Sequence, residues 1–143
     1  MNLQVRPFHG PTDWGWVNSI LPIMQVEDTS GLIAFDGDTG ERFGACILDN
    51  WTHNSVQGHF LISAPRVLKY GFLELCADYI FNFMARKVLY AFVPANNEKA
   101  LKLDARIGFT EVFRMPDGFT DGVDYVVLQL LKENCTVLKT EAA

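Results

Sequence analysis

The chain has 143 residues, of which 49% are hydrophobic and 20% charged, and its formal net charge is −5. This composition excludes a disordered chain, and the length suits one domain with a core of its own. The acidic balance and the scattered lysines and arginines argue against a binding surface for duplex DNA or RNA.

The cysteines and the termini limit the cellular setting. Cys46, Cys76 and Cys135 show no metal-ligand spacing, and the first two stand in apolar runs where a buried, inert thiol is expected. The N-terminal segment lacks the apolar core of a signal peptide, and no apolar run is long enough to cross a bilayer. We therefore expect a cytoplasmic monomer or homodimer that binds no nucleic acid, no membrane and no metal.

A strand and a helix are predicted at the N-terminal end. Residues 2–8 alternate weakly between polar and apolar side chains, which favours a strand. Apolar residues at helical spacing then predict a helix that begins at Thr12 or Asp13 and runs to about Met24. Pro22 would kink or end this helix.

Three antiparallel strands are predicted next. The apolar segments 31–36 and 42–51 flank a turn at 37–40 that is rich in glycine and aspartate, a pattern typical of a hairpin. A second turn at 52–54 leads into a third strand at 55–62.

A β-α-β unit is predicted in the middle of the chain. A strand is predicted at 87–93, in which residues 88–93 form a continuous apolar run, as expected of a strand covered on both faces and parallel to the strand at 55–62. The helix between them, at 72–85, should bury one wide apolar face. The residues of that face are Phe72, Leu75, Cys76, Tyr79, Ile80 and Phe83.

The last third of the chain predicts a helix and a pair of strands. Asn97 is a suitable N-cap, and Gly108 is a typical stop signal. The predicted elements are, in order, a helix at 97–107, a strand at 110–115, a turn at 116–118, a strand at 125–131 and a frayed tail at 139–143.

The corner at 63–71, between strand and helix, is a candidate anion site. Backbone N–H groups at a helix start have no partner within the helix, and the helix dipole adds partial positive charge there. Arg66 and Lys69 bring two cationic side chains to the same corner. A Pro/Gly turn before an amphipathic helix is also ordinary punctuation in α/β folds, so the corner alone does not decide the function.

Two blocks of the sequence resemble the GCN5-related N-acetyltransferase family. Residues 66–71 (RVLKYG) stand where the family has its coenzyme A corner, Arg/Gln-x-x-Gly-x-Gly/Ala. Asn97, Ala100 and the pair Gly108-Phe109 match the spacing of the family's next helix. The order of predicted elements is also similar to the family's, and the chain looks like the short acetyltransferase-like proteins of tailed phages.

The resemblance implies an α/β (α+β) fold, with a mixed, mostly antiparallel central sheet of six to seven strands and helices on both faces. It implies a single domain over residues 1–143, acetyl-CoA as co-substrate, and acetyl transfer to a primary amine of a small molecule or a protein. The implied coenzyme A site consists of Leu61, Ile62, Ser63, Arg66, Lys69, Tyr70, Gly71, Phe72, Asn97 and Ala100.

Acetyl transfer to an amine needs a polarised thioester carbonyl and a group that removes a proton from the ammonium. His59 lies on the strand that flanks the thioester in the family, and it is the first candidate for the general base. His53 in the preceding turn is the second candidate, and Asp49 is a third that would act through a water. A single histidine on a strand can equally be structural.

Two departures from the family pattern leave other functions open. Lys69 replaces the first glycine of the corner, where it either reaches the phosphates or crowds them. Asp104 replaces the tyrosine that acts as general acid in many members, and an aspartate donates protons poorly at neutral pH unless it is desolvated. The alternatives are a catalytically inactive protein of this fold with a coenzyme A-binding or structural role, and an unrelated α+β ligand-binding module.

Overall fold

The computed structural model describes residues 1–21, 23 and 25–138. The predictions for Pro22, Met24 and the tail at 139–143 lie outside the described residues. The strands are β1 (Leu3–Pro7), β2 (Ser30–Asp36), β3 (Arg42–Asp49), β4 (Ser55–Ile62), β5 (Val88–Pro94), β6 (Thr110–Thr120) and β7 (Val123–Leu131).

The strands form a seven-stranded sheet in the order β1-β2-β3-β4-β5-β7-β6. The pair β4–β5 is parallel, and the other five neighbouring pairs are antiparallel. The structure thus confirms the mixed, mostly antiparallel sheet, the meander of β2, β3 and β4, and the parallel β-α-β unit.

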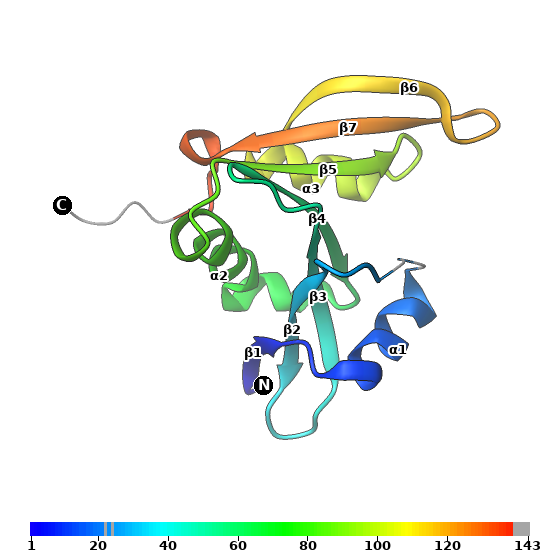
Figure 1. Ribbon diagram of the computed structural model, residues 1–143. Helices are drawn as coiled ribbons and strands as arrows, with labels where there is room; N and C mark the ends of the chain where they lie inside the picture. Colours follow the sequence, from blue (N-terminus) through cyan, green and yellow to red (C-terminus); the bar gives the residue numbers. More distant parts are fainter. Residues whose placement is uncertain (22, 24, 139–143) are drawn as a thin grey trace.

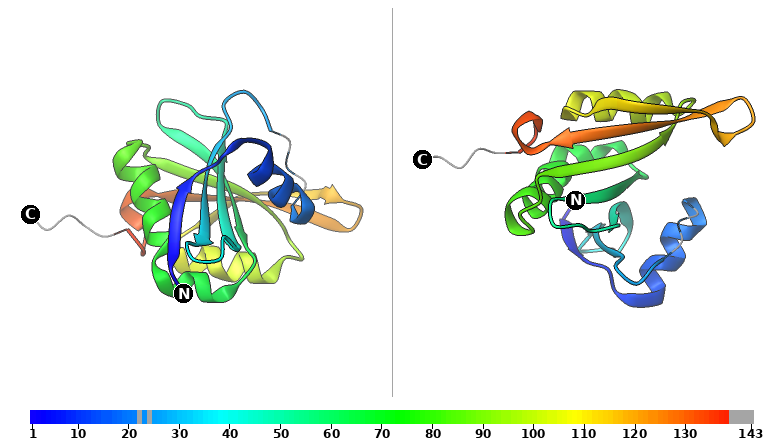
Figure 2. Two further views of the ribbon diagram at one scale, coloured as in Figure 1. Left: turned by 90° about the horizontal axis from the view of Figure 1, so that it is seen from below. Right: turned by 45° about the horizontal axis from the view of Figure 1, so that its top comes forward.

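Helices cover both faces of the sheet, as predicted (Figures 1 and 2). One face holds α1 (Gly10–Ile20) over a small core that includes Trp14, Val17 and Ile47. The other face holds the larger core, which includes residues of both α2 and α3. The helices on that face are η1 (Pro65–Tyr70), α2 (Phe72–Asp78), its π-helical continuation η2 (Tyr79–Phe83) and α3 (Glu98–Ile107), and η3 (Lys132–Asn134) follows β7.

The parallel strands β4 and β5 are paired only where they begin. The register joins Ser55, Val56 and Gln57 to Val88, Leu89 and Tyr90, respectively. Beyond these residues the strands diverge, and over residues 58–62 the edge of β4 that faces β5 has no strand partner among the described strands. Figure 1 shows how the divergence splits the sheet into one half of β1 to β4 and another of β5, β7 and β6.

The N-terminal helix begins earlier than predicted, at Gly10, because Asp13 does not cap it. The carboxylate of Asp13 is fully buried and accepts hydrogen bonds from Arg6 at 2.6 Å, from the His9 amide at 2.5 Å and from Arg42 at 3.0 Å. Burial alone would raise the pKa of Asp13, but these hydrogen bonds outweigh it and lower the pKa to about 2. Asp13 therefore ties α1 to β1 and β3.

The prediction for the buried face of the helix at 72–85 was partly wrong. Leu75 and Phe83 are exposed, Phe83 by 77%, while Leu73, Ala77 and Phe81 are buried in their place. The chain widens to a π-helix at Tyr79–Phe83, which rotates the last residues away from the phase of a regular α-helix. The predicted residues Phe72, Cys76 and Ile80 are buried.

Two further predictions need correction. The strand at 87–93 is not covered on both faces, since Leu89, Ala91 and Val93 are buried while Tyr90 and Phe92 are only half-buried. The turn between the last strands is not at 116–118, because β6 continues to Thr120 and the chain turns at residues 121 and 122. Pro116, Asp117 and Gly118 belong to an irregular stretch of β6, residues 116–119, that lies opposite Asp124.

Candidate active site

The carboxyl ends of β4 and β5 point the same way, because these strands are parallel. The corner at 63–71 follows β4, and the N-terminus of α3 follows β5 shortly after its end. Ligands commonly bind at the carboxyl ends of parallel strands, where the connections separate. All ten residues predicted for coenzyme A lie at or just beyond these two strand ends.

The corner at 63–71 is a 3₁₀ helix, η1, followed by Gly71. Gly71 has a φ of 82°, a left-handed conformation that glycine adopts without strain. Arg66 is exposed and lies over the ring of Phe43, with 4.6 Å between Cζ and the ring centroid. Lys69 and Tyr70 are also exposed, and within the described part of the chain no carboxylate pairs with Arg66 or Lys69. Both cations are therefore available to a diphosphate.

One carboxylate at this corner works against an anion. Glu74 lies in the first turn of α2, and its buried Oε2 has no hydrogen-bond partner among the described residues. A Cβ built on Gly71 would lie 3.8 Å from this oxygen, so Glu74 is close to the corner itself. With Arg66 and Lys69 the three side chains carry a net charge of +1, and the corner still favours a bound phosphate, although less than two free cations would.

Several residues predicted to bind coenzyme A have polar groups that are already hydrogen-bonded or side chains that are buried. The amide and hydroxyl of Ser63 both donate to the carbonyl of Phe43, at 2.9 Å each. The side chains of Leu61 and Phe72 are buried in the two cores, and Ile62 is half-buried. These residues therefore offer backbone groups, which is what a pantetheine chain lying along β4 would use.

Asn97 and Ala100 form the N-terminal cap of α3. The side-chain oxygen of Asn97 accepts the amide of Ala100 at 3.2 Å, and Gly108 ends the helix with a φ of 117°. Both predicted helix boundaries are thus confirmed. The cap accounts for this part of the motif without a ligand, and the side-chain NH₂ of Asn97 has no hydrogen-bond partner within the described residues.

His59, which is half-buried, and Asp49, which is buried, lie close together beside the divergence. Asp49 is opposite Gln57 in the β3–β4 register, so Asp49 and His59 share the sheet face that α1 covers further along. Nε2 of His59 lies 3.4 Å from Oδ2 of Asp49, in ion-pair range but without hydrogen-bond geometry. Nε2 and the other oxygen, Oδ1 of Asp49, are buried and have no partner among the described residues.

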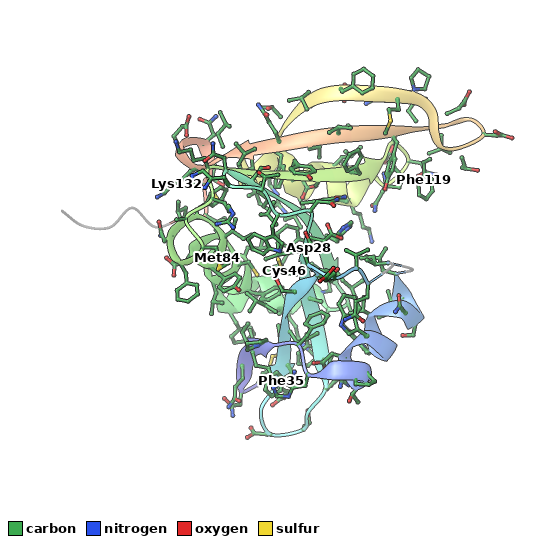
Figure 3. The ribbon with its side chains drawn as sticks, viewed as in Figure 1. Asp28, Phe35, Cys46, Met84, Phe119 and Lys132 are labelled. Carbon is green, nitrogen blue, oxygen red and sulfur yellow. The ribbon has the colours of Figure 1, made fainter. Side chains whose placement is uncertain are left out.

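Aromatic residues of β5 and β7 continue this face past the divergence. Tyr90 is paired with Gln57 and therefore lies on the same face as His59. Phe92 and Tyr125 follow, with ring centroids 5.4 Å apart, and Phe119 lies 5.5 Å beyond Tyr125. Figure 3 labels Phe119 near the outer end of β5.

Two carboxylates give this face negative charge. Burial raises the pKa of Tyr90, and the charges of Asp49 and Asp28 raise it further. Asp28 accepts the amide of Trp51 at 3.1 Å, and Figure 3 labels it beside β4. The face next to His59 therefore combines aromatic rings with anionic charge, which suits a cationic ligand.

Asp104 lies on the buried face of α3 and is only 7% exposed. Burial raises its pKa to about 7, so that half of the molecules carry a neutral Asp104 carboxyl at that pH. Asp104 can therefore donate a proton near neutral pH, unlike an aspartate in water. No side chain of the described residues donates a hydrogen bond to this carboxylate.

The other candidates lie elsewhere. His53 is exposed in the turn before β4, outside the strand that carries His59. Within residues 1–21, 23 and 25–138, no group of three or more metal-ligating side chains gathers, and no helix is long and apolar enough to cross a membrane. A small cavity among Phe60, Leu89 and Ile107 lies in the apolar core, away from His59.

The sequence analysis did not identify Tyr90 and Asp28 as part of the sheet face that carries His59. Tyr90 stands in an apolar run whose alternation could have shown it, since Tyr90 and Phe92 occupy every second position. Asp28 lies in a loop, and its approach to Tyr90 depends on how β3 and β5 are placed in the sheet.

The fold is similar to solved structures of spermidine/spermine N-acetyltransferase SpeG from Vibrio cholerae. The structure in complex with manganese ions superposes with a TM-score of 0.77 and 15% identity, over 92% of this chain and 94% of that chain. A dodecameric structure in an intermediate state gives a TM-score of 0.74 and 19% identity, over 92% and 95%. No family model and no curated protein sequence matches the chain. The chain thus has the fold of the GCN5-related N-acetyltransferases, as the sequence predicted.

Proposed function

We propose that this chain is an acetyl-CoA-dependent N-acetyltransferase that acts on a primary amine. The observation that carries this proposal is the divergence of β4 from β5 beside His59 and Asp49, which have buried polar atoms without a hydrogen-bond partner among the described residues. The fold it shares with spermidine/spermine N-acetyltransferases supports the same reaction class.

Acetyl-CoA supplies the activated acetyl group as a thioester. Arg66 and Lys69 would hold its diphosphate, and the exposed edge of β4 over residues 58–62 would hydrogen-bond its pantetheine arm. Gly71 lets the corner turn without strain between η1 and α2. In this arrangement the thioester carbonyl would lie near the divergence, on the side of His59.

His59 is the proposed general base. Its buried Nε2 would take a proton from the acceptor ammonium, and the adjacent carboxylate of Asp49 would stabilise the imidazolium that results. The free amine would then attack the thioester carbonyl, and as the carbon–sulfur bond breaks the nitrogen would release its second proton to solvent while the thiolate of coenzyme A leaves. The neutral carboxyl of Asp104 is the candidate donor of the proton that this thiolate takes up.

The acceptor is proposed to be a cationic amine of the polyamine type. Asp28 and Asp49 give the face beside His59 negative charge, and Tyr90 and Phe92 add aromatic surface for an alkyl chain or an ammonium group. The structural neighbours act on spermidine and spermine, according to their names. A primary amine on a protein, such as a lysine side chain, is the other acceptor that this surface can admit.

Calorimetry with acetyl-CoA and a thiol-release assay test the proposal together. We expect saturable binding of acetyl-CoA and faster thiol release with spermidine than with a monoamine such as butylamine. Lys132→Ala, a charge removed from an exposed site on η3, is the matched control and should change neither measurement. No binding of acetyl-CoA would contradict the proposal as a whole.

The alternative is a catalytically inactive protein of this fold, whose support in the sequence is that Lys69 and Asp104 depart from the family pattern. The fold shared with acetyltransferases does not favour it over an active enzyme. Binding of acetyl-CoA without turnover on any amine would select this candidate over an active enzyme.

A further inference from the structure

A small cavity lies in the larger core, between the helices and the part of the sheet where β4 and β5 diverge. Its volume is about 10 Å³, close to the space that one water molecule requires. Phe60 of β4 and Leu89 of β5 line it from the sheet, and Ala77 of α2 and Ile107 of α3 line it from the helices. Cys135, which follows η3, lines it from the C-terminal segment.

The lining of this cavity is apolar. Among the described residues that border it, the thiol of Cys135 is the only side-chain group that is not a hydrocarbon. A water molecule there would lack the two to four hydrogen-bond partners that buried waters usually have, so the cavity stays dry. Protein cores are usually packed without such gaps, because the atoms around a gap lose dispersion contacts. An apolar group of a ligand would restore these contacts.

The cavity and the candidate active site lie on opposite faces of the same two strands. Phe60 faces the larger core, while His59 and Leu61 on either side of it face the other way. In β5, Leu89 faces the larger core and Tyr90 lies on the face of His59. A thioester at the divergence would therefore have the catalytic side chains on one side and the cavity on the other.

Gly58 leaves the core side of the divergence without a polar or bulky barrier. It is the first residue of β4 beyond the part that pairs with β5. A Cβ built on Gly58 would lie 2.8 Å from Cδ1 of Leu89, so Leu89 packs directly against the backbone of β4. An acyl group carried to this edge would meet only apolar side chains on the core side, those of Leu89 and Phe60, and both of them line the cavity.

We propose that the cavity receives the end of the donor's acyl chain, and that the chain transfers a three-carbon propionyl group as well as an acetyl group. This inference rests on the proposed function, in which the edge of β4 over residues 58–62 holds the pantetheine arm. The acyl chain would turn from the thioester into the larger core, and the acceptor amine would approach from the face of His59. A volume of about 10 Å³ admits one carbon beyond acetyl and excludes a second.

The reaction is the same acyl transfer with a longer acyl group. The amine nitrogen bonds to the carbonyl carbon, the carbon–sulfur bond breaks, and coenzyme A leaves as its thiolate. The acceptor ammonium releases two protons in all, and the thiolate takes up one of them. Propionyl-CoA carries the same activating thioester as acetyl-CoA, so no further reactant is required.

Calorimetry with coenzyme A thioesters of increasing length tests the cavity without requiring turnover. Propionyl-CoA should bind about fourfold more tightly than acetyl-CoA, the gain expected from burying one methylene group. Butyryl-CoA has one carbon more than the cavity holds, and overpacking should make it bind at least about fivefold more weakly than propionyl-CoA. In the thiol-release assay with spermidine, kcat/KM for propionyl-CoA should be at least as high as for acetyl-CoA.

Two substitutions in the lining change the size of the cavity in opposite directions. Ala77→Val fills it and should abolish the preference for propionyl-CoA while leaving the affinity for acetyl-CoA unchanged. Ile107→Val enlarges it by one carbon and should tighten the binding of butyryl-CoA about fourfold. Ala34→Val in the larger core and Ile33→Val in the small core are the matched controls, and both residues lie outside the cavity lining. They should leave all three affinities unchanged, and melting curves establish that each variant is folded.

The possible failures of this proposal differ from those of the proposed function. Propionyl-CoA that binds no more tightly than acetyl-CoA would overturn the role of the cavity and leave acetyl transfer in place. A preference for propionyl-CoA that persists in Ala77→Val would also overturn it, because the third carbon would then lie outside the cavity. If acetyl-CoA itself does not bind, the proposed function fails and this inference fails with it.

Discussion

His59 and Asp49 stand side by side on neighbouring strands, with 3.4 Å between Nε2 and Oδ2, and each has a buried polar atom without a hydrogen-bond partner within the described residues. A buried polar atom left unpartnered destabilises the folded state by about 1–3 kcal/mol. Protein interiors rarely leave such atoms unpaired, and those that remain are often found where a water or a ligand binds. Because the pair lies beside the divergence of β4 from β5, we propose that an incoming amine is its partner.

His59→Ala should lower kcat about a hundredfold, the lower end of the range for general acid–base catalysis. The dissociation constant of acetyl-CoA should change little, because the proposed cofactor contacts lie on the edge of β4 and at the corner. Thiol release gives kcat, and calorimetry gives the dissociation constant. His53→Ala, at the exposed turn before β4, is the control and should be as active as the unmodified chain. Equal rates for the two variants would exclude His59 as the base.

Asp49→Asn should separate function from stability. The substitution removes a buried charge that has one oxygen without a partner, so the melting temperature should stay the same or rise. The amide cannot stabilise an imidazolium at His59 or attract a cationic acceptor, and kcat/KM for the amine should fall about tenfold or more. A structural role for Asp49 predicts the reverse, a lower melting temperature with unchanged kcat/KM.

The sequence was sufficient for the parts of the fold that depend on local signals. The strand Ser55–Ile62 was predicted with its observed bounds, and Asn97 and Gly108 marked the ends of α3 because capping is a property of a few adjacent residues. The predicted start of α1 was wrong. Asp13 has the sequence pattern of an N-cap, but its carboxylate binds Arg6 of β1 and Arg42 of β3.

The candidate site was predictable only where one strand carries it. His59 was found because β4 is recognisable, but its approach to Asp49 depends on the register of β3 with β4. The raised pKa of Asp104 was likewise beyond the sequence, since it depends on how deeply α3 is buried. Periodicity indicates which face of a helix turns inward, but not how far water is excluded from it.

Arg66→Ala or Lys69→Ala should each weaken the binding of coenzyme A by about 1.5–3 kcal/mol, the range for hydrogen bonds to charged groups. The effect should shrink at high salt, because both side chains are exposed and their charges are screened. Glu74→Gln should have the opposite effect and tighten binding, since it removes a negative charge beside Gly71. Calorimetry at two salt concentrations measures all three.

A control variant and a contrary result complete the test of the corner at 63–71. Lys132→Ala removes a charge from η3 and should leave the affinity unchanged. Tighter binding by Lys69→Gly would mean that the Lys69 side chain obstructs the diphosphate. Unchanged affinity in Arg66→Ala, Lys69→Ala and Glu74→Gln together would place the diphosphate elsewhere.

The stability of the chain should be greatest near pH 4, because two buried aspartates titrate in opposite directions. Burial raises the pKa of Asp104 from 3.8 to about 7. Between these values the folded chain holds a proton that the unfolded chain has released, so the free energy of unfolding falls as the pH rises from about 4 to 7. The difference of about three pKa units is worth roughly 4 kcal/mol at most.

Asp13 gives the opposite slope at lower pH. Its pKa falls from 3.8 to about 2, so the stabilisation that it provides is complete above about pH 4 and is lost as the pH drops toward 2, by roughly 2 kcal/mol. Asp104→Asn cannot ionise and should abolish the decline between pH 4 and 7 while leaving the acid limb in place. Urea unfolding from pH 2 to 8 measures both limbs, with Asp121→Asn at the exposed hairpin turn as the control. If Asp104→Asn keeps the decline of the unmodified chain, the Asp104 carboxyl is not desolvated, and it is no better a proton donor than an aspartate in water.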